Sequence, residues 1–366
     1  MILSIEKKDF IQGVQIVGRF VDKGSASLPV LGNILVVVSS EGIKFRGTNL
    51  ETGIDRLVAG SHTGEGVVAI PARILEQLAS VQVGEGVITL EQSGDTVLVK
   101  SGMARSSIKT MPYEDFPILP VPEQSKGTFS LTGAVLQQLL SSVASCASTS
   151  TVRPELASVY LSIEGGVCSV VSTDSFRLVE KKVALTEKTI PTKLLIPAKN
   201  ALDIAQALPQ EKVTVSFDEH QCTVSAPGLL LTTRLTSAAY PDYRQIIPKE
   251  VVAEATVLRK DLELALKRSM IFSDSFQKVK LSFDPKKKTL ALSARNADVG
   301  EFDESIQGQV SGGAVEISFN HRYLMTFFSL TGAESVTLSV SGVGRPLSMR
   351  PVGDTTLLYL VMPMNQ

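Results

Sequence analysis

EKKDFIQGVQIVG (residues 6–18) is the first of three related segments, and LTGAVLQQLLSSV (131–143) and LRKDLELALKRSM (258–270) are the other two. Phe10, Leu136 and Leu262 occupy the same place in them, and both steps are 126 residues (136 − 10 and 262 − 136). Self-similarity at a fixed period indicates one structural unit that is repeated along the chain. The sequence therefore predicts a body made of three copies of one unit.

The unit combines helices with hairpins. Apolar residues at helical spacing predict a first helix in each copy, over 6–21, 132–144 and 258–272. A second helix is expected after Pro71 and Pro197, with proline at the first helical position, and the third copy has SFNHRYLMTF (318–327) in that place. Apolar runs broken by turn residues predict hairpins, for example over 33–49, 158–174 and 279–295. The predicted fold class is α+β, with two helices and about eight strands in each of three repeated domains.

Two proline-containing linkers separate the copies, PYEDFPILPVPEQSK (112–126) and YPDYRQIIPKEV (240–251). They predict domains over residues 1–122, 123–248 and 249–366.

Composition narrows the class of protein. A formal net charge of −1 gives no global basic signature, so any contact with nucleic acid requires a local basic surface. No apolar stretch approaches the roughly 18 residues of a membrane-spanning helix, and no signal peptide is evident. Three cysteines, Cys146, Cys168 and Cys222, indicate reduced thiols and a cytoplasmic location.

Motifs of catalysis are absent from the sequence. It contains no phosphate-binding loop, dinucleotide fingerprint, HExxH or GxSxG motif. His62, His220 and His321 are isolated, so neither a metal nor another cofactor is expected. These observations argue against an enzyme, although catalytic residues need not be adjacent in sequence.

Cations recur on the predicted helices and could form one concave basic surface that attracts phosphates without reading bases. The candidate DNA-facing residues are Lys7, Lys8, Arg19, Lys23, Arg73, Lys199, Lys267, Arg268 and Arg322.

Five ordered segments carry a family resemblance: LPVLGNILV (28–36), VLVKSGMARSSIKTMPYEDFP (97–117), STDSFRL (172–178), YPDYRQIIPK (240–249) and YLVMPM (359–364). Together they resemble the bacterial DNA polymerase III beta subunit, the DNA sliding clamp. The resemblance implies three clamp domains per chain and two chains that close head to tail into a ring of six domains. Such a ring holds duplex DNA by topological linkage and needs only weak, sequence-independent phosphate contacts. The implied function is a non-catalytic processivity factor.

The resemblance also implies a hydrophobic cleft that binds short peptides from the polymerase III alpha subunit, the clamp loader and other clamp-motif proteins. Carried over, the cleft residues are Leu156, Thr173, Ser175, Phe176, Arg177, Leu178, Pro241, Gln245, Ile246, Pro346, Leu360, Val361, Met362, Pro363 and Met364. Phe176 stands where histidine or tyrosine is frequent, and Gln245 where arginine is frequent, so a shifted peptide preference is expected. Met362 and Met364 are expected to be more exposed than Leu360.

Ring closure is implied between an edge strand of the first domain, 104–109, and an edge strand of the third domain. Ile108, Ile271 and Phe272 are expected to form an apolar seam, and Glu301, Asp303 and Glu304 to face Arg105 and Lys109. Ser106, Met103 and Ile74 depart from residues frequent in the family, so the homodimer is expected to dissociate more readily than its relatives.

Two other classes stay open on the residues alone. One is an enzyme built from repeats, and the other is a monomeric DNA-binding scaffold that never closes into a ring.

Overall fold

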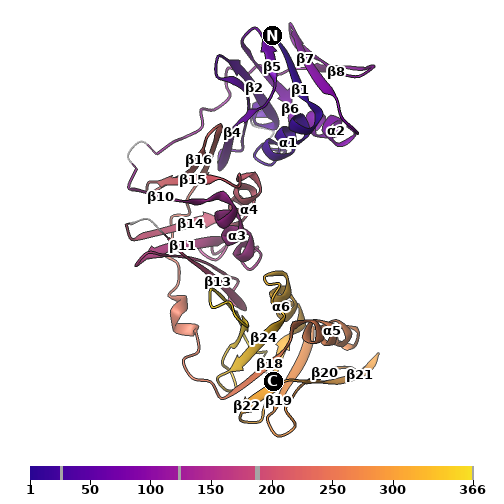
Figure 1. The fold of residues 1–366 in the computed structure, drawn as a ribbon, viewed down its shortest axis with the longest axis vertical. Helices are drawn as coiled ribbons and strands as arrows, with labels where there is room; N and C mark the ends of the chain where they lie inside the picture. Colours follow the sequence, from indigo (N-terminus) through magenta and orange to yellow (C-terminus); the bar gives the residue numbers. More distant parts are fainter. Residues whose placement is uncertain (25–27, 123–124, 186–189, 365–366) are drawn as a thin grey trace. The chain divides into compact units, whose positions relative to one another are not determined.

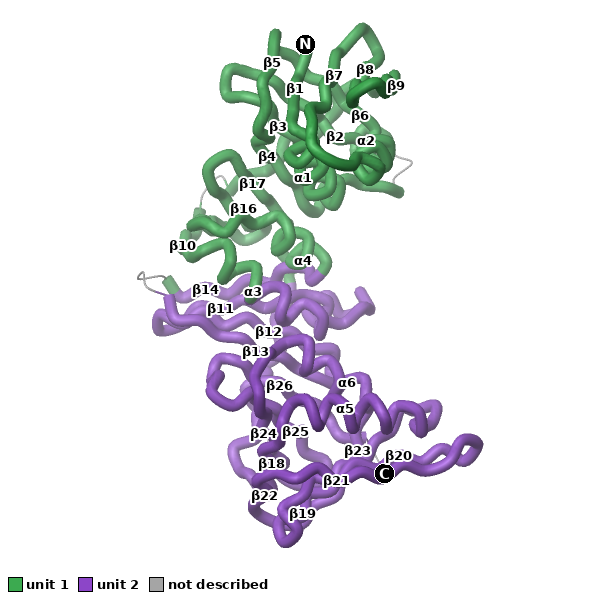
Figure 2. The backbone as a smooth tube through the Cα atoms, turned by 45° about the vertical axis from the view of Figure 1, so that its right-hand side comes forward, with its two compact units in different colours: residues 1–138, 187–190, 199–237 green, residues 139–186, 191–198, 238–366 purple. Residues whose placement is uncertain are grey.

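A computed structural model of the chain describes residues 1–24, 28–122, 125–185 and 190–364 (Figure 1). The chain divides into two compact units (Figure 2). Unit 1 comprises residues 1–138, 187–190 and 199–237, and unit 2 comprises residues 139–186, 191–198 and 238–366. Asn365, Gln366 and the start of the expected second domain at residue 123 lie outside the described residues.

The elements recur in the same order in each third of the chain. The first third contains β1 (Ile2–Glu6), α1 (Lys7–Val17), η1 (Pro29–Gly32), β2 (Asn33–Ser39), β3 (Gly42–Thr48), β4 (Thr52–Val58), β5 (Ser61–Thr63), β6 (Gly66–Pro71), α2 (Ala72–Ser80), β7 (Val87–Ser93), β8 (Thr96–Ser101) and β9 (Ala104–Lys109). The second contains β10 (Gly127–Thr132), α3 (Gly133–Ala144), β11 (Ser158–Glu164), β12 (Val167–Thr173), β13 (Arg177–Ala184), β14 (Thr192–Pro197), α4 (Ala198–Ala207), β15 (Lys212–Phe217), β16 (Gln221–Ala226) and β17 (Leu229–Arg234). After η2 (Tyr243–Ile246), the last third contains β18 (Ala253–Leu258), α5 (Arg259–Ser269), η3 (Met270–Phe272), β19 (Lys278–Asp284), β20 (Thr289–Asn296), β21 (Gly300–Gln307), β22 (Gln309–Gly312), β23 (Val315–Asn320), α6 (His321–Thr326), η4 (Phe327–Ser329), β24 (Ser335–Val340), β25 (Leu347–Pro351) and β26 (Leu357–Val361). The predicted repeat and the α+β class are confirmed.

Four antiparallel sheets join these strands. Unit 1 has sheets of order β5-β1-β7-β8-β9 and β10-β15-β16-β17-β4-β3-β2-β6, and unit 2 has sheets of order β14-β11-β12-β13-β26-β25-β24-β18-β22 and β21-β20-β19-β23. Two of the sheets run from one repeat into the next, because β4 pairs with β17 and β13 pairs with β26. Open edges remain at the ends of each sheet, and among them are β9 and β21.

Helix α1 shows how a helix packs inside a repeat. It contacts β3 and β4 of one sheet and β1 and β7 of another. Phe10, Val14 and Val17 on its inner face are fully buried, and the rings of Phe10 and Phe45 form a T-shaped pair with centroids 6.4 Å apart. A side chain at Gly13 would come within 3.1 Å of Val58, so the helix lies as close to the sheet as glycine allows. Burial of each large apolar side chain contributes about 2 kcal/mol.

Expected helix boundaries require correction at residue 21, Pro71 and Pro197. The first helix ends at Val17 instead of continuing to residue 21. Pro71 and Pro197 end strands β6 and β14, and their helices begin one residue later, at Ala72 and Ala198. Pro71 has ψ 116°, which is extended backbone, so it precedes the helix as its cap and does not form its first turn.

The described residues contain no group of three or more His, Cys, Asp or Glu side chains placed to hold a metal ion. Burial raises the pKa of Cys146 to about 11 and that of Cys168 to about 12, so both thiols stay protonated and unreactive. No helix in the described part of the chain is long and apolar enough to cross a membrane.

Candidate functional site

A tight turn connects β12 to β13 in unit 2 and holds Phe176 out from the sheet. The Thr173 hydroxyl donates to the Arg177 carbonyl at 2.6 Å, and Asp174 Oδ1 accepts from the backbone N–H groups of Phe176 (2.9 Å) and Arg177 (3.0 Å). Ser175 has φ 78°, the left-handed region that side chains rarely adopt. Strain of this kind persists where the surroundings fix the backbone. Phe176 at the tip is 58% exposed.

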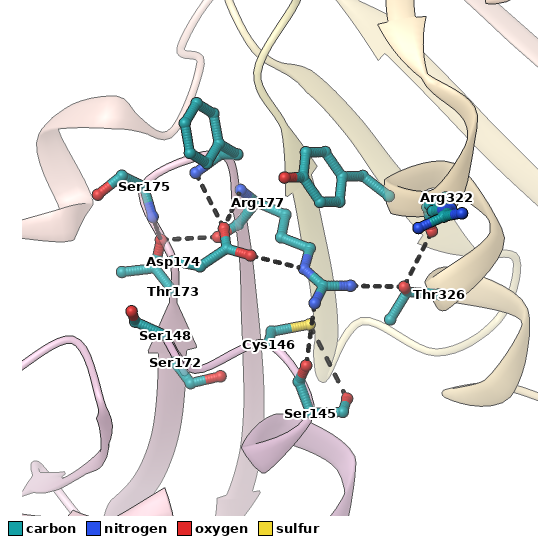
Figure 3. Close-up of polar contacts among 12 residues, drawn as sticks. Ser145, Cys146, Ser148, Ser172, Thr173, Asp174, Ser175, Arg177, Arg322 and Thr326 are labelled. Carbon is teal, nitrogen blue, oxygen red and sulfur yellow. Dashed lines mark hydrogen bonds and ion pairs between the residues drawn. The ribbon is translucent and has the colours of Figure 1, made fainter. Parts of the chain in front are cut away.

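Arg177 ties this turn to segments far away in sequence. Its guanidinium donates to Asp174 Oδ2 (3.0 Å), to the Thr326 hydroxyl (2.6 Å) and to the Ser145 carbonyl (3.1 Å), as Figure 3 shows. It also lies 5.1 Å from the centre of the Tyr323 ring, within range of a cation–π contact. The fork geometry of arginine suits several directed bonds at once, so this residue fixes the β13 turn against α6.

Tyr323 completes an aromatic pair that sequence reasoning missed. The rings of Phe176 and Tyr323 are stacked, with centroids 6.1 Å apart and an interplanar angle of 16°. Met362 donates its backbone N–H to the Phe176 carbonyl at 2.8 Å, so the C-terminal tail passes beside this pair. The only sequence signal for Tyr323 was its place on the second helix of the third repeat.

The second linker covers the neighbouring part of the same sheet. Leu178 on β13 lies opposite Leu360 on β26, and both pack against Tyr243 of η2. The Tyr243 hydroxyl donates to buried Glu180 at 2.6 Å. Burial raises the pKa of Tyr243 and this hydrogen bond raises it further, so the phenol stays protonated. The linker is thereby anchored over the β13–β26 pair.

The tail after β26 remains accessible. Met362, Pro363 and Met364 are half-buried, and the Met364 backbone N–H donates to the Ser318 carbonyl at 2.8 Å. Pro363 and Met364 line a cavity of about 350 Å³ together with Val343, Gly344, Lys280, Glu316, Ile317 and Ser318. The tail is therefore held at two points and still presents methionine side chains to solvent.

The fifteen expected cleft residues differ in exposure. Pro241, Ser175, Phe176, Gln245 and Ile246 are exposed, whereas Arg177, Met362, Pro363 and Met364 are half-buried. The remaining six are buried: Leu156, Thr173, Leu178, Pro346, Leu360 and Val361. The structure brings the turn, the tail, α6 and the linker around the β13–β26 pair, and all fifteen residues belong to unit 2.

The expected DNA-facing cations are distributed over both units. Those of unit 1 are Lys7, Lys8, Arg19, Lys23, Arg73 and Lys199, and those of unit 2 are Lys267, Arg268 and Arg322. All are exposed except Lys7, which is half-buried and donates to the Val83 carbonyl at 3.0 Å. Three form ion pairs with other described residues, namely Lys23 with Glu76, Lys267 with Glu263 and Arg268 with Glu304. Arg19, Lys23 and Lys199 line one cavity of about 280 Å³ in unit 1.

The expected closure residues lie on or beside the two open edges. Arg105 and Lys109 on β9 are exposed, whereas Ile108 is 6% exposed and already packed in its own sheet. Beside β21, Ile271 is 65% exposed, and Phe272 stacks on Phe302 at 6.0 Å.

The three acidic residues of β21 do not share a face. Strand alternation directs Glu301 and Asp303 to one side, and Glu304 to the other, where it pairs with Arg268 at 2.8 Å. Glu301 also has a partner, Arg295, at 3.0 Å. Asp303 has no ion pair among the described residues.

Comparisons with known proteins agree along the whole chain. Family models of the DNA polymerase III beta subunit match residues 1–120 (N-terminal domain), 130–242 (central domain) and 244–365 (C-terminal domain). The beta sliding clamps of Pseudomonas aeruginosa and Vibrio cholerae are each 26% identical, with full coverage of both chains. A crystal structure of the Pseudomonas aeruginosa DnaN sliding clamp bound to griselimycin is 25% identical with a TM-score of 0.93 over the full length of both chains. The Thermotoga maritima beta subunit, 22% identical, has the same fold with a TM-score of 0.93 and covers 100% of this chain and 99% of that one.

Proposed function

Because the chain belongs to the DNA polymerase III beta subunit family, the bacterial sliding clamps, we propose that two copies of it close head to tail into a ring around duplex DNA. The chain is a non-catalytic processivity factor of DNA replication. Its three domains, with boundaries proposed at residues 122 and 248, would supply the six domains of the ring. We place the protein in the cytoplasm.

Ring closure is supported by two strands that lack the partners their counterparts have. Within the repeat, β4, β13 and β21 are equivalent, and so are β17, β26 and β9. A strand of the first set pairs with a strand of the second set in two cases: β4 pairs with β17, and β13 pairs with β26. Of these six strands, all within the described residues, β21 and β9 are the two that end a sheet and keep an open edge. An open strand edge is a template for another strand, and a head-to-tail contact that repeats and closes gives a ring. This observation carries the proposal.

The repeat also predicts the register of the missing pair on the β21 side. Thr48 lies opposite Gly53, Thr173 opposite Leu178, and Arg295 opposite Glu301. The next residue along each strand is Ile54, Val179 or Phe302. Phe302 is therefore the counterpart of Ile54 and Val179.

The same reasoning applies to β9. Leu231 and Tyr359 lie opposite Ile54 and Val179, respectively. In the preceding strands, Val224 lies opposite Leu231 and Met349 lies opposite Tyr359. Both correspond to Val99 of the first repeat, which lies opposite Ser106. Ser106 of one copy is therefore proposed to lie opposite Phe302 of the other.

This register makes specific pairs across the closure. An antiparallel alignment with Ser106 opposite Phe302 also sets Arg105 opposite Asp303 and Ser107 opposite Glu301. Arg105 and Asp303 would share one face of the joined sheet, and the small side chain of Ser106 leaves room for the Phe302 ring. Because Ser106 adds little apolar area, we expect a dimer that dissociates more readily than its relatives. Analytical ultracentrifugation across a dilution series tests this, and a dimer that persists at picomolar concentration would contradict it.

Partner peptides are proposed to dock in unit 2, beside the β13–β26 pair and the tail. The exposed Phe176 ring stacked on Tyr323 offers an aromatic surface, and the methionines of the tail adapt to irregular apolar side chains. The proposed partners are the polymerase III alpha subunit, the clamp loader and other clamp-motif proteins. Phe176→Ala should lower the affinity for a fluorescent clamp-motif peptide about 10-fold, because an aromatic contact of this size contributes roughly 1.5 kcal/mol. Val167→Ala, on an exposed position of β12, is the matched control.

The DNA-facing surface is proposed to be built from the nine cations named above. Replacement of Lys199, Arg73 and Arg268 by alanine should weaken retention on circular DNA, with a smaller salt dependence. If retention and its salt dependence stay the same, these residues do not face DNA.

A further inference from the structure

The cavity of about 280 Å³ in unit 1 contains a carboxyl group among cations. It lies between the segment that follows α1, which supplies Arg19, Val21, Asp22 and Lys23, and the first turns of α4, which supply Lys199 and Asp203; Asn49 completes its lining. The volume equals that of about nine liquid water molecules, enough for a phosphate group and its closest waters. The three cations favour the binding of an anion, whereas the carboxylate of Asp203 disfavours it.

The charges in this cavity differ in how far they are already neutralised. Lys23 pairs with Glu76 at 2.8 Å, and Asp22 Oδ1 accepts from the Gly24 backbone N–H at 2.9 Å. Arg19 and Lys199 have no ion pair among the described residues. Asp203 has neither an ion pair nor a side-chain hydrogen bond there, although Lys199 lies one helical turn before it. The half-buried carboxylate therefore acts on the cations through the electric field and not through a direct bond.

Burial raises the pKa of Asp203, while Lys199, Arg19 and Lys23 act in the opposite direction. Burial therefore disfavours the ionised form of Asp203, and no hydrogen bond from its side chain to another described residue offsets this effect. The charge of Asp203 therefore acts on the cations that line the same cavity.

We propose that this cavity accepts one phosphate of the DNA backbone and that Asp203 weakens the contact, so that the clamp holds DNA loosely enough to slide. The inference rests on the proposed DNA-facing role of Arg19, Lys23 and Lys199. Three cations around one phosphate would make a strong, salt-sensitive contact that must break at every step along the duplex. One carboxylate within the same cavity offsets part of that attraction without removing the cations that guide the backbone.

The test compares the full chain with Asp203→Asn, which removes the charge and keeps the shape. Binding of a fluorescein-labelled duplex is measured by anisotropy across a potassium chloride series. The Asp203→Asn variant should bind about 5-fold more tightly, since one repulsive charge nearby costs of the order of 1 kcal/mol. The slope of log affinity against log salt should steepen, because the cavity presents one more net positive charge to the same phosphate. Asp203→Ser should behave alike, because charge and not shape is the cause.

Glu114→Gln is the matched control, since it removes one exposed carboxylate from the first linker. It should leave affinity and slope unchanged, so an equal gain in this variant would reduce the effect to net charge and overturn the inference.

Other variants separate the inference from the function on which it rests. Arg19→Ala and Lys199→Ala should weaken duplex binding. If they do so while Asp203→Asn binds the duplex no more tightly than the native chain, the inference fails and the DNA-facing assignment stands. If neither cation variant changes duplex binding, the DNA-facing assignment itself fails.

A thermal shift measurement distinguishes the backbone phosphate from a free anion. Inorganic phosphate should protect the native chain no more than chloride does at equal ionic strength. Specific protection that disappears in Lys199→Ala would make the cavity a small-anion site and overturn the proposal.

Discussion

The register proposed for ring closure predicts a charge-reversal experiment on Arg105. In that register Arg105 of one copy lies opposite Asp303 of the other, and Asp303 has no competing ion pair among the described residues. Arg105→Glu replaces an attraction by a repulsion at this position. Because Arg105 is exposed on an edge strand, the change should leave the fold of each chain intact.

The magnitude follows from the geometry of the ring. A solvent-exposed cross-strand ion pair contributes about 0.5 kcal/mol, and reversal of one charge costs about twice that, or about 1 kcal/mol. A closed dimer contains two identical closures, so the substitution acts twice and should cost about 2 kcal/mol. The dissociation constant of the dimer should therefore rise about 30-fold. Added salt should reduce the effect, because exposed charges are screened.

Sedimentation velocity over a dilution series measures the dissociation constant, and a second substitution tests the register. Asp303→Arg in the same chain as Arg105→Glu restores an opposite-charge pair at both closures, so the double variant should recover most of the lost affinity. Glu301→Arg should rescue less, because Glu301 lies diagonally across from Arg105 and already pairs with Arg295. Equal dimer affinity for native and Arg105→Glu chains would refute the pairing. Better rescue by Glu301→Arg than by Asp303→Arg would refute the register.

Three further predictions concern unit 2. Arg177→Ala should lower the free energy of unfolding by about 2 kcal/mol, because its charged hydrogen bonds to Thr326 and other partners are lost; Arg177→Lys should not restore it, and an unchanged denaturation midpoint would contradict the role given to this side chain. Burial raises the pKa of Asp354, but hydrogen bonds from Lys181 and Thr356 outweigh it and bring the pKa to about 2. Because this pKa is lower than in the unfolded chain, the carboxylate stabilises the fold at pH values above the unfolded pKa, and this stabilisation is lost as the pH falls towards 2. Lys181→Met should therefore lower the free energy of unfolding by about 1 kcal/mol at neutral pH after allowance for solvent screening, and the difference from the native chain should shrink below about pH 4. A difference independent of pH in denaturation curves would exclude this account. Deletion of Met362–Gln366 should abolish the binding of clamp-motif peptides in fluorescence polarisation while the dimer remains, and unchanged peptide affinity would reject the docking site.

Local patterns in the sequence predicted the elements well. The apolar spacing around Phe10, Leu136 and Leu262 predicted helices that the structure places at α1, α3 and α5. Turn residues between apolar runs predicted hairpins such as β2–β3 and β11–β12. These features depend on residues only a few positions apart, so they can be read along the chain. The error at Pro71 was equally local, because proline fixes φ but leaves ψ free to be extended.

The candidate site was predictable only as a list of residues. The family resemblance supplied Arg177 and Met362, but not the contact of Arg177 with Thr326, 149 residues further along the chain. Nor did it supply the stack of Tyr323 on Phe176 or the hydrogen bond from the tail to the Phe176 carbonyl. Apolar periodicity identifies which face of an element is buried and does not identify the element that covers it.

The sequence by itself determined that one α+β unit occurs three times, because period and turn chemistry are local properties that survive in any arrangement of the copies. Only the tertiary structure decided how the copies are joined, with β4 paired to β17 and β13 paired to β26, because strand pairing between repeats depends on which edges meet in space. The same tertiary pairing left β9 and β21 with open edges. Those two unpaired edges, which no residue pattern marks, are the physical basis for the proposed ring.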